Sequence, residues 1–162
     1  ISNSMLLEIK EKKQLVKQEQ LKKIKKTKND LKIINKMLQT DPQNLNLLLA
    51  KASMAAIIQD IETEIETLKK IIKINPITNV KSLLAQAYLR KNDGIVNEFI
   101  KKLIDEVLFE KPKDPGANFI LAKYLNQNGK KNKSRNLLLK ILKNLDDKGP
   151  WHQIYKDELN IK

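Results

Sequence analysis

Few side chains in this sequence could perform chemistry. The chain has no cysteine and one histidine, His152. Disulfides, thiolate metal sites, thiol nucleophiles and histidine-built metal centres are therefore excluded. Trp151 stands beside His152 and is expected to pack against a core or cap. A haem-ligand role for His152 would need a second ligand and an apolar slot, and the neighbouring sequence supplies neither.

The acidic cluster Asp60, Glu62, Glu64 and Glu66 is the other candidate for chemistry. On a helix the three glutamates spread around the cylinder, so they do not form the paired carboxylates of an acid–base site. Asp60 and Glu62 instead fit the start of a helix, where negative charge complements the helix dipole. We therefore predict that the protein is not an enzyme and has no catalytic residue, metal site, cofactor or small-molecule substrate.

The net charge is +13, and it comes almost entirely from lysine. Of 32 basic residues, only Arg90 and Arg135 are arginine. Proteins that read nucleic acid depend on arginine for bidentate and stacking contacts. Lysine, isoleucine and asparagine are all abundant together, which is typical of an A/T-rich coding sequence. Nucleic acid is therefore not an expected partner, although a nucleic-acid or membrane-surface role for residues 10–36 is the alternative from a different functional class.

Composition predicts an all-α protein. The 162 residues are enough for one domain, but they include only 4 glycines, 5 prolines and 4 % aromatic residues. A β-sandwich or barrel needs more turn residues and more strand-forming aromatics. No apolar run approaches the roughly 20 residues that cross a bilayer.

Residues 1–40 are predicted to form a basic N-terminal helix or linker. Residues 5–40 hold 11 lysines and 4 acidic residues, and Asp41-Pro42 ends the segment. Apolar residues recur every three, four or seven positions, as in an amphipathic helix that is weakly held up to about Lys28. This stripe consists of Leu6, Ile9, Val16, Leu21, Ile24, Leu31, Ile34 and Leu38.

Residues 41–162 are predicted to form a repeat domain. Pro42, Pro76 and Pro112 are 34 and 36 residues apart, a period typical of stacked helix pairs. Small residues that let paired helices approach closely recur in Leu49-Ala50-Lys51-Ala52, Leu84-Ala85-Gln86-Ala87-Tyr88 and Leu121-Ala122-Lys123-Tyr124-Leu125. A last helix is expected to begin near Pro150 and to cap the stack, with Trp151, Ile154, Tyr155 and Leu159 facing inward.

The third of these segments, residues 121–125, resembles part of a tetratricopeptide repeat. Its leucine, alanine and tyrosine are followed at that motif's spacing by Gly129, Ser134, Leu138 and Ile141. The second repeat keeps Leu84, Ala85 and Tyr88, whereas the first repeat is looser. The resemblance implies a right-handed superhelical stack of about three helix pairs with a C-terminal capping helix.

A narrower resemblance covers roughly residues 30–162. The lengthened turn Gly94-Ile95-Val96-Asn97-Glu98 and the closing segment Leu145-Asp146-Asp147-Lys148-Gly149-Pro150-Trp151 are similar to motifs in one family. That family is the periplasmic repeat domain of the bacterial c-type cytochrome biogenesis subunit CcmI/CycH. Asn97 and Glu98 stand where the family usually has threonine and proline.

This resemblance implies a peptide-binding adaptor or chaperone. It would bind the C-terminal region of unfolded apocytochrome c, or another helical peptide, and present it to the haem lyase subunits of cytochrome maturation. The expected location is the periplasm, with a tether to the inner membrane in a segment absent from this sequence, which begins at Ile1 rather than Met. The alternatives are a generic tetratricopeptide-repeat scaffold in another assembly and a cytoplasmic location.

The first helices of stacked pairs line a concave groove, which predicts the peptide site. By register, the groove residues are Lys51, Met54, Ser82, Gln86, Arg90, Phe119, Lys123, Asn126 and Gln127. A helical peptide would place its apolar stripe on Met54 and Phe119, while the lysines and Arg90 would hold acidic groups. For each residue the alternative is an ordinary solvated polar face.

Overall fold

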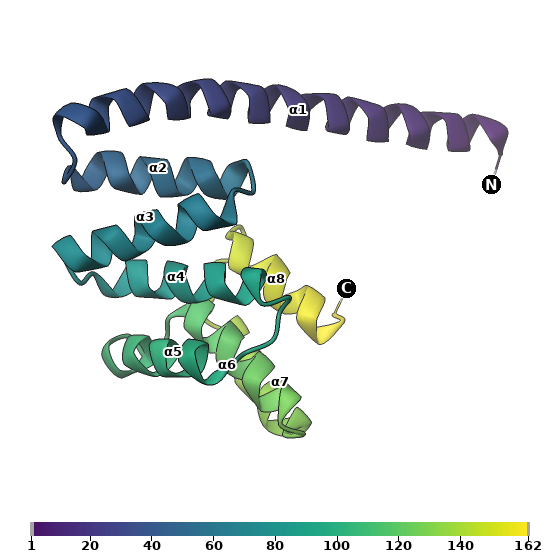
Figure 1. Cartoon of the computed structure of the whole chain (residues 1–162). Coiled ribbons are helices and arrows are strands. Elements are labelled where there is room, and N and C mark those ends of the chain that lie inside the picture. The colour runs from purple at the N-terminus through teal and green to yellow at the C-terminus, as the bar shows by residue number, and fades with distance from the viewer. Residues whose placement is uncertain (1, 162) are drawn as a thin grey trace. The chain divides into compact units, whose positions relative to one another are not determined.

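The computed structural model describes residues 2–161, which form eight helices and no strand. The helices are α1 (Asn3–Thr40), α2 (Leu45–Ile57), α3 (Ile61–Ile74), α4 (Thr78–Lys91), α5 (Glu98–Glu110), α6 (Pro115–Gln127), α7 (Lys131–Leu142) and α8 (Pro150–Leu159). The predicted all-α class is confirmed. Figure 1 shows the order of the helices along the chain.

The chain divides into two compact units, Ile1–Thr67 and Leu68–Lys162, with the division inside α3. The boundary predicted between residues 40 and 41 stays a prediction. The outer ends of the two predicted segments, residues 1 and 162, lie outside the described residues. In the first unit α1 packs against α2. The side chains of Leu6, Ile9, Val16 and Leu21 on α1 are exposed, whereas Ile24, Leu31, Ile34 and Leu38 are half-buried.

The second unit consists of helices that pack in consecutive pairs. α4 contacts α5, α6 contacts α7, and α7 contacts α8. The first helices of successive pairs also meet, since α4 contacts α6 and α6 contacts α8. Contacts of both kinds are those of a helical repeat stack.

Residue types at the helix ends explain where the helices begin. Asn44, Asp60, Asn97 and Asp114 each accept a hydrogen bond from the backbone N–H three residues on, which is the contact of an N-cap. Between α6 and α7, Gly129 has a φ of 75°, a left-handed conformation that favours glycine. The last helix begins at Pro150, which confirms the predicted start near this residue.

Small and apolar residues fill the core of the second unit, as the recurring alanine-containing segments predict. Ala85, Ala87 and Ala122 are buried between helices. Their neighbours on the second helices are buried as well, namely Ile100, Ile104, Val107, Leu138 and Ile141. Tyr155 and Leu159 of α8 are buried, but the prediction for Ile154 is wrong, because its side chain is 38 % exposed.

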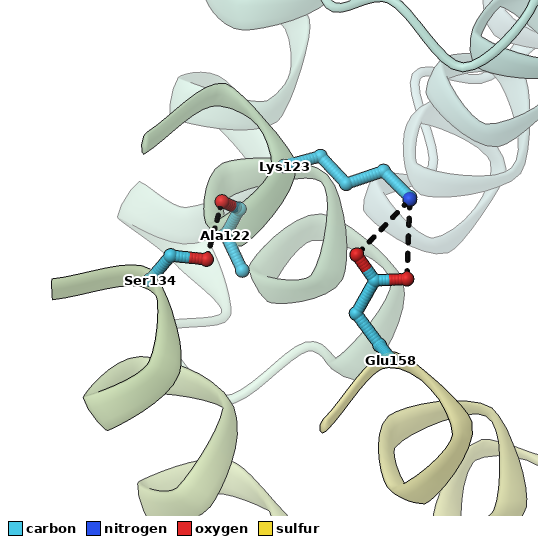
Figure 2. A network of polar contacts seen from close by, with 4 residues as sticks. All are labelled: Ala122, Lys123, Ser134 and Glu158. Atoms are coloured by element: carbon cyan, nitrogen blue, oxygen red, sulfur yellow. Dashed lines mark hydrogen bonds and ion pairs between the residues drawn. The ribbon is translucent and has the colours of Figure 1, made fainter. Parts of the chain in front are cut away.

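The close approach of α6 and α7 is visible at Ser134. This residue is 7 % exposed, and its hydroxyl donates to the backbone carbonyl of Ala122 over 2.7 Å, as Figure 2 shows. A side chain larger than serine would have to displace the backbone of α6. The small residue expected at this position of the repeat motif therefore has a steric reason to be there.

Replacing Ser134 tests this close approach. We expect Ser134→Ala to lower the free energy of unfolding by about 1 kcal/mol, because one hydrogen bond is lost. Ser134→Leu should cost more, roughly 2–3 kcal/mol, because the larger side chain forces the helices apart. Urea unfolding followed by the fluorescence of Trp151 measures both, and equal effects of the two substitutions would contradict the close packing.

Candidate peptide-binding face

The predicted binding residues of the first unit lie on α2. Lys51 and Met54 are both half-buried. The carboxylate of Asp60, at the start of α3, accepts hydrogen bonds from the hydroxyl and the backbone N–H of Thr63. These two bonds lower the pKa of Asp60, and the positive charge of Lys51 lowers it further.

Two of the predicted binding residues on α4, Ser82 and Gln86, take part in the contact between α4 and α6. Ser82 is only 3 % exposed, and its hydroxyl donates to Oδ1 of Asp114 over 2.8 Å. The same oxygen accepts the backbone N–H of Ala117 over 2.8 Å, so one carboxylate both caps α6 and ties it to α4. Gln86 donates from Nε2 to the Ser82 hydroxyl over 3.2 Å. Ser82 therefore lies inside the contact between α4 and α6 rather than on an open face.

Gly116 explains how α4 and α6 come so close. A Cβ placed at Gly116 would lie 2.3 Å from Nε2 of Gln86 and 3.0 Å from the hydroxyl oxygen of Ser82. Any other residue there would have to push the Gln86 side chain away. Gly116 thus leaves room for the end of the Gln86 side chain, which bonds to Ser82.

An aromatic cluster joins α6 to α8. The ring of Phe119 lies 5.9 Å from the ring of Trp151 and 5.8 Å from the ring of Tyr155, centroid to centroid. Tyr155 is fully buried and its hydroxyl donates to the backbone carbonyl of Pro115 over 2.7 Å. Burial raises the pKa of Tyr155 far above its ordinary value, and the negative charge of Asp114 raises it further.

Lys123 lies at the edge of this cluster and is already paired within the chain. Its Nζ is 3.2 Å from both carboxylate oxygens of Glu158 on α8 and 5.0 Å from the centroid of the Phe119 ring. Both side chains remain partly exposed, at 27 % and 32 %. In Figure 2, Lys123 reaches toward α8 whereas its neighbour Ala122 faces α7. An acidic ligand would meet Lys123 only by sharing it with Glu158 or by displacing Glu158.

The remaining predicted residues lie at the ends of α4 and α6. Gln127 accepts the backbone N–H of Val96 over 2.7 Å and donates to its carbonyl over 3.2 Å, which fixes the lengthened turn between α4 and α5. Asn126 and Arg90 are exposed. Gln127 thus supports the structure of a turn that the sequence had marked as unusual.

The structure brings together two groups of predicted residues in the second unit, Ser82 with Gln86 and Phe119 with Lys123. Sequence reasoning missed Glu158 and Asp114, which are the partners of Lys123 and Ser82. The separations of 35 and 32 residues between these partners are close to one repeat length, so the period itself was the available signal. Leu83, three residues before Gln86 and 44 % exposed, was also missed.

In residues 2–161 no three histidine, aspartate or glutamate side chains are grouped as metal ligands. Across the same described range, none of the helices is long and apolar enough to span a membrane. The candidate face combines a partly exposed aromatic ring, a cation shared with one carboxylate, and neighbouring exposed polar groups.

Asp114→Ala tests whether one carboxylate holds α4 and α6 together. We expect the free energy of unfolding to fall by about 2 kcal/mol, because the N-cap of α6 and the bond to Ser82 are lost together. Asp147→Ala, at an exposed position outside the helices, is the matched control and should change stability by less than about 0.5 kcal/mol. Urea denaturation measures both, and a loss no larger than that of the control would contradict the tie.

The raised pKa of Tyr155 predicts a loss of stability in alkali. Above about pH 10 the unfolded chain ionises this tyrosine and the folded chain does not, so stability falls by roughly 1.4 kcal/mol per pH unit. Tyr155→Phe removes this part of the pH dependence and leaves every other titratable group in place. Thermal unfolding of the two proteins from pH 8 to about pH 11.5 measures the difference, and parallel curves would contradict the burial of the phenol.

Comparison with known proteins adds no family to this picture. No protein-family model matches the sequence, and no curated protein matches it significantly. The likeness to tetratricopeptide repeats and to the cytochrome biogenesis domain therefore stays a prediction from the sequence motifs. The described residues form only helices, and from α4 to α8 each helix contacts the next, which is compatible with a helical repeat stack.

Proposed function

We propose that this chain is a non-enzymatic peptide-binding adaptor of the tetratricopeptide-repeat type. Its ligand is a helical peptide, specifically the C-terminal region of apocytochrome c, which it delivers to the haem lyase subunits of c-type cytochrome maturation. In this proposal the stack is a right-handed superhelix with α8 as its cap. The protein works in the periplasm, tethered to the inner membrane.

The repeat character of the proposal is supported by contacts between residues about one repeat apart. Ser82 and Asp114 are separated by 32 residues, Val96 and Gln127 by 31, and Lys123 and Glu158 by 35. Equivalent positions of successive repeats lie next to each other in a stack of helix pairs, so separations near the repeat length are expected. The first helices that make these contacts are the ones that line the binding face of such stacks.

The observation that carries the binding proposal is the arrangement of Lys123, Phe119 and Glu158. A partly exposed ammonium group lies over an aromatic ring and beside one carboxylate. An amphipathic peptide helix can lay its apolar stripe against the ring and bring an acidic side chain to the ammonium group. Glu158 then acts as an internal competitor, which favours ligands with a well-placed acidic group over weakly acidic ones.

The assignment to cytochrome maturation is supported by the sequence motifs near residues 94–98 and 145–151. Around the first of these motifs, the structure has a turn that Gln127 holds through both of its amide atoms. Around the second, the chain enters α8 at Pro150. The resemblance to that family rests on these two segments. The proposed binding partner and the proposed cellular location of the protein follow from the resemblance alone.

A titration with a fluorescent peptide from the C-terminal helix of apocytochrome c tests the proposal. We expect binding by the intact chain and an affinity about three- to tenfold lower for Lys123→Gln, since a partly exposed charged contact is lost. Glu158→Gln should raise the affinity, because it removes the internal competitor for Lys123. Lys131→Gln, an exposed lysine at the start of α7, is the matched control and should leave binding unchanged.

The outcomes separate the specific function from the general one. Absence of detectable binding, or an equal loss for Lys123→Gln and Lys131→Gln, would contradict the proposed face. Equal affinity for an unrelated helical peptide of the same charge would remove the cytochrome assignment and leave the generic repeat scaffold.

A further inference from the structure

The N-terminal half of α1 exposes a long series of apolar side chains. Met5, Leu6, Ile9 and Val16 lie along one stripe of the helix, and each is between 43 % and 55 % exposed. Leu7, Leu15 and Leu21 are 57–60 % exposed and lie on other sides of the helix. The sequence pattern placed Leu21 in the stripe, but Leu21 lies about 120° around the helix from Ile9. Isolated exposed leucines are ordinary, but a stripe along a helix indicates a surface that meets another element.

The exposed stripe continues an interface that already exists in the first unit. Farther along α1, Ile24, Leu31, Ile34 and Leu38 continue the same stripe and are half-buried, and Thr27 among them is 7 % exposed. This is the part of α1 alongside which α2 lies, whereas the N-terminal half of α1 extends past the end of α2 (Figure 1). At 1.5 Å per residue α1 is about 57 Å long and α2 about 20 Å. One face of α1 is thus covered by a helix at one end and uncovered at the other.

The charge around the uncovered stripe is positive. Residues 3–28 contain nine lysines and three glutamates, a net charge of +6. At about 100° per residue, the charged side chains within about 60° of Ile9 in residues 3–23 are Lys12, Lys13 and Lys23. Glu8, Glu11 and Glu19 lie farther around the helix. A partner that covers the stripe must therefore place acidic groups beside it.

Other occupants fit this surface less well than an acidic helix. A second copy of α1 would bring lysines against lysines along the whole contact. A nucleic acid would leave the apolar stripe uncovered, and residues 2–40 offer no arginine or aromatic side chain for base contacts. Helices that lie in a bilayer surface have a broad apolar face, whereas this stripe is narrow and holds Lys13 and Gln20.

We propose that residues 5–23 of α1 bind one amphipathic helix of a partner protein, side by side, as a continuation of the packing of α2 on α1. The partner helix has an apolar stripe at three- and four-residue spacing with acidic residues on its borders. Leu6, Ile9 and Val16 form the apolar contact, and Lys12 and Lys13 pair with the acidic borders. This surface is on the first unit and is separate from the proposed peptide site on α6 and α8.

The probe that tests this proposal is a labelled designed peptide of about three heptads, with leucine at the two core positions and glutamate at the flanking ones. Its glutamates prevent the probe from pairing with itself. We expect the full chain to bind it in a fluorescence anisotropy titration. The triple variant Leu6→Gln, Ile9→Gln and Val16→Gln should bind at least about tenfold more weakly, because the apolar contact is lost.

The chain offers a matched control on the other sides of the same helix segment. The triple variant Leu7→Gln, Leu15→Gln and Leu21→Gln removes three equally exposed leucines and should keep the affinity within about twofold. Glutamine is nearly as good a helix former as leucine, and circular dichroism checks that both variants keep α1 helical. A second probe, with lysine in place of glutamate, should bind at least about tenfold more weakly than the acidic one.

Three results would overturn the proposal. The first is that the acidic probe does not bind the full chain. The second is that the two triple variants lose affinity equally, or that the lysine probe binds as well as the acidic one. The third is that vesicles of phosphatidylcholine and phosphatidylglycerol capture the chain through Leu6, Ile9 and Val16 while the acidic probe does not, which would assign the stripe to a membrane surface.

Discussion

Two helices approach each other closely only where the side chains between them are small, and α6 satisfies this condition on several sides. It contacts α4, α5, α7 and α8. Gly116 admits the side chains of α4, Ala117 is fully buried, and Ala122 lies against Ser134 of α7. The large side chains of this 13-residue helix pack where there is room: Phe119 packs against Trp151 and Tyr155 of α8, whereas Ile120 packs in the core with residues of α4 and α5.

Close packing also decides what the polar residues of the second unit do. Once the first helices of successive pairs are in contact, polar groups between them need partners, because an unpaired buried group is costly. Ser82, which is 3 % exposed, donates a hydrogen bond to Asp114. Gln127 and Lys123 are nearer the surface and bond to the backbone of Val96 and to Glu158. Residues that could have formed an open polar face therefore hold the stack together. The peptide-binding face that we propose is therefore smaller than the predicted one and centres on α6 and α8.

The sequence predicted the helical class and the spacing of the elements well, because these depend on local signals. Proline spacing, alanine-rich phrases and the 3.6-residue period need no knowledge of which helices meet. The binding residues were harder to predict, because exposure depends on partners that lie about 30 residues away. Ser82 is polar and faces inward, whereas Ile154 is apolar and is 38 % exposed. Both errors have the same cause: a one-helix pattern cannot tell a face that meets a neighbour from one that meets water.

The central claim is that equivalent positions of successive helix pairs lie against each other. Nuclear Overhauser spectroscopy on the intact, isotope-labelled chain measures such proximity directly. We predict cross-peaks between the side-chain amide of Gln127 and the backbone N–H of Val96, and between the protons of Ser82 and Gly116. A spectrum in which these residues show cross-peaks only within their own helices and turns would contradict this claim.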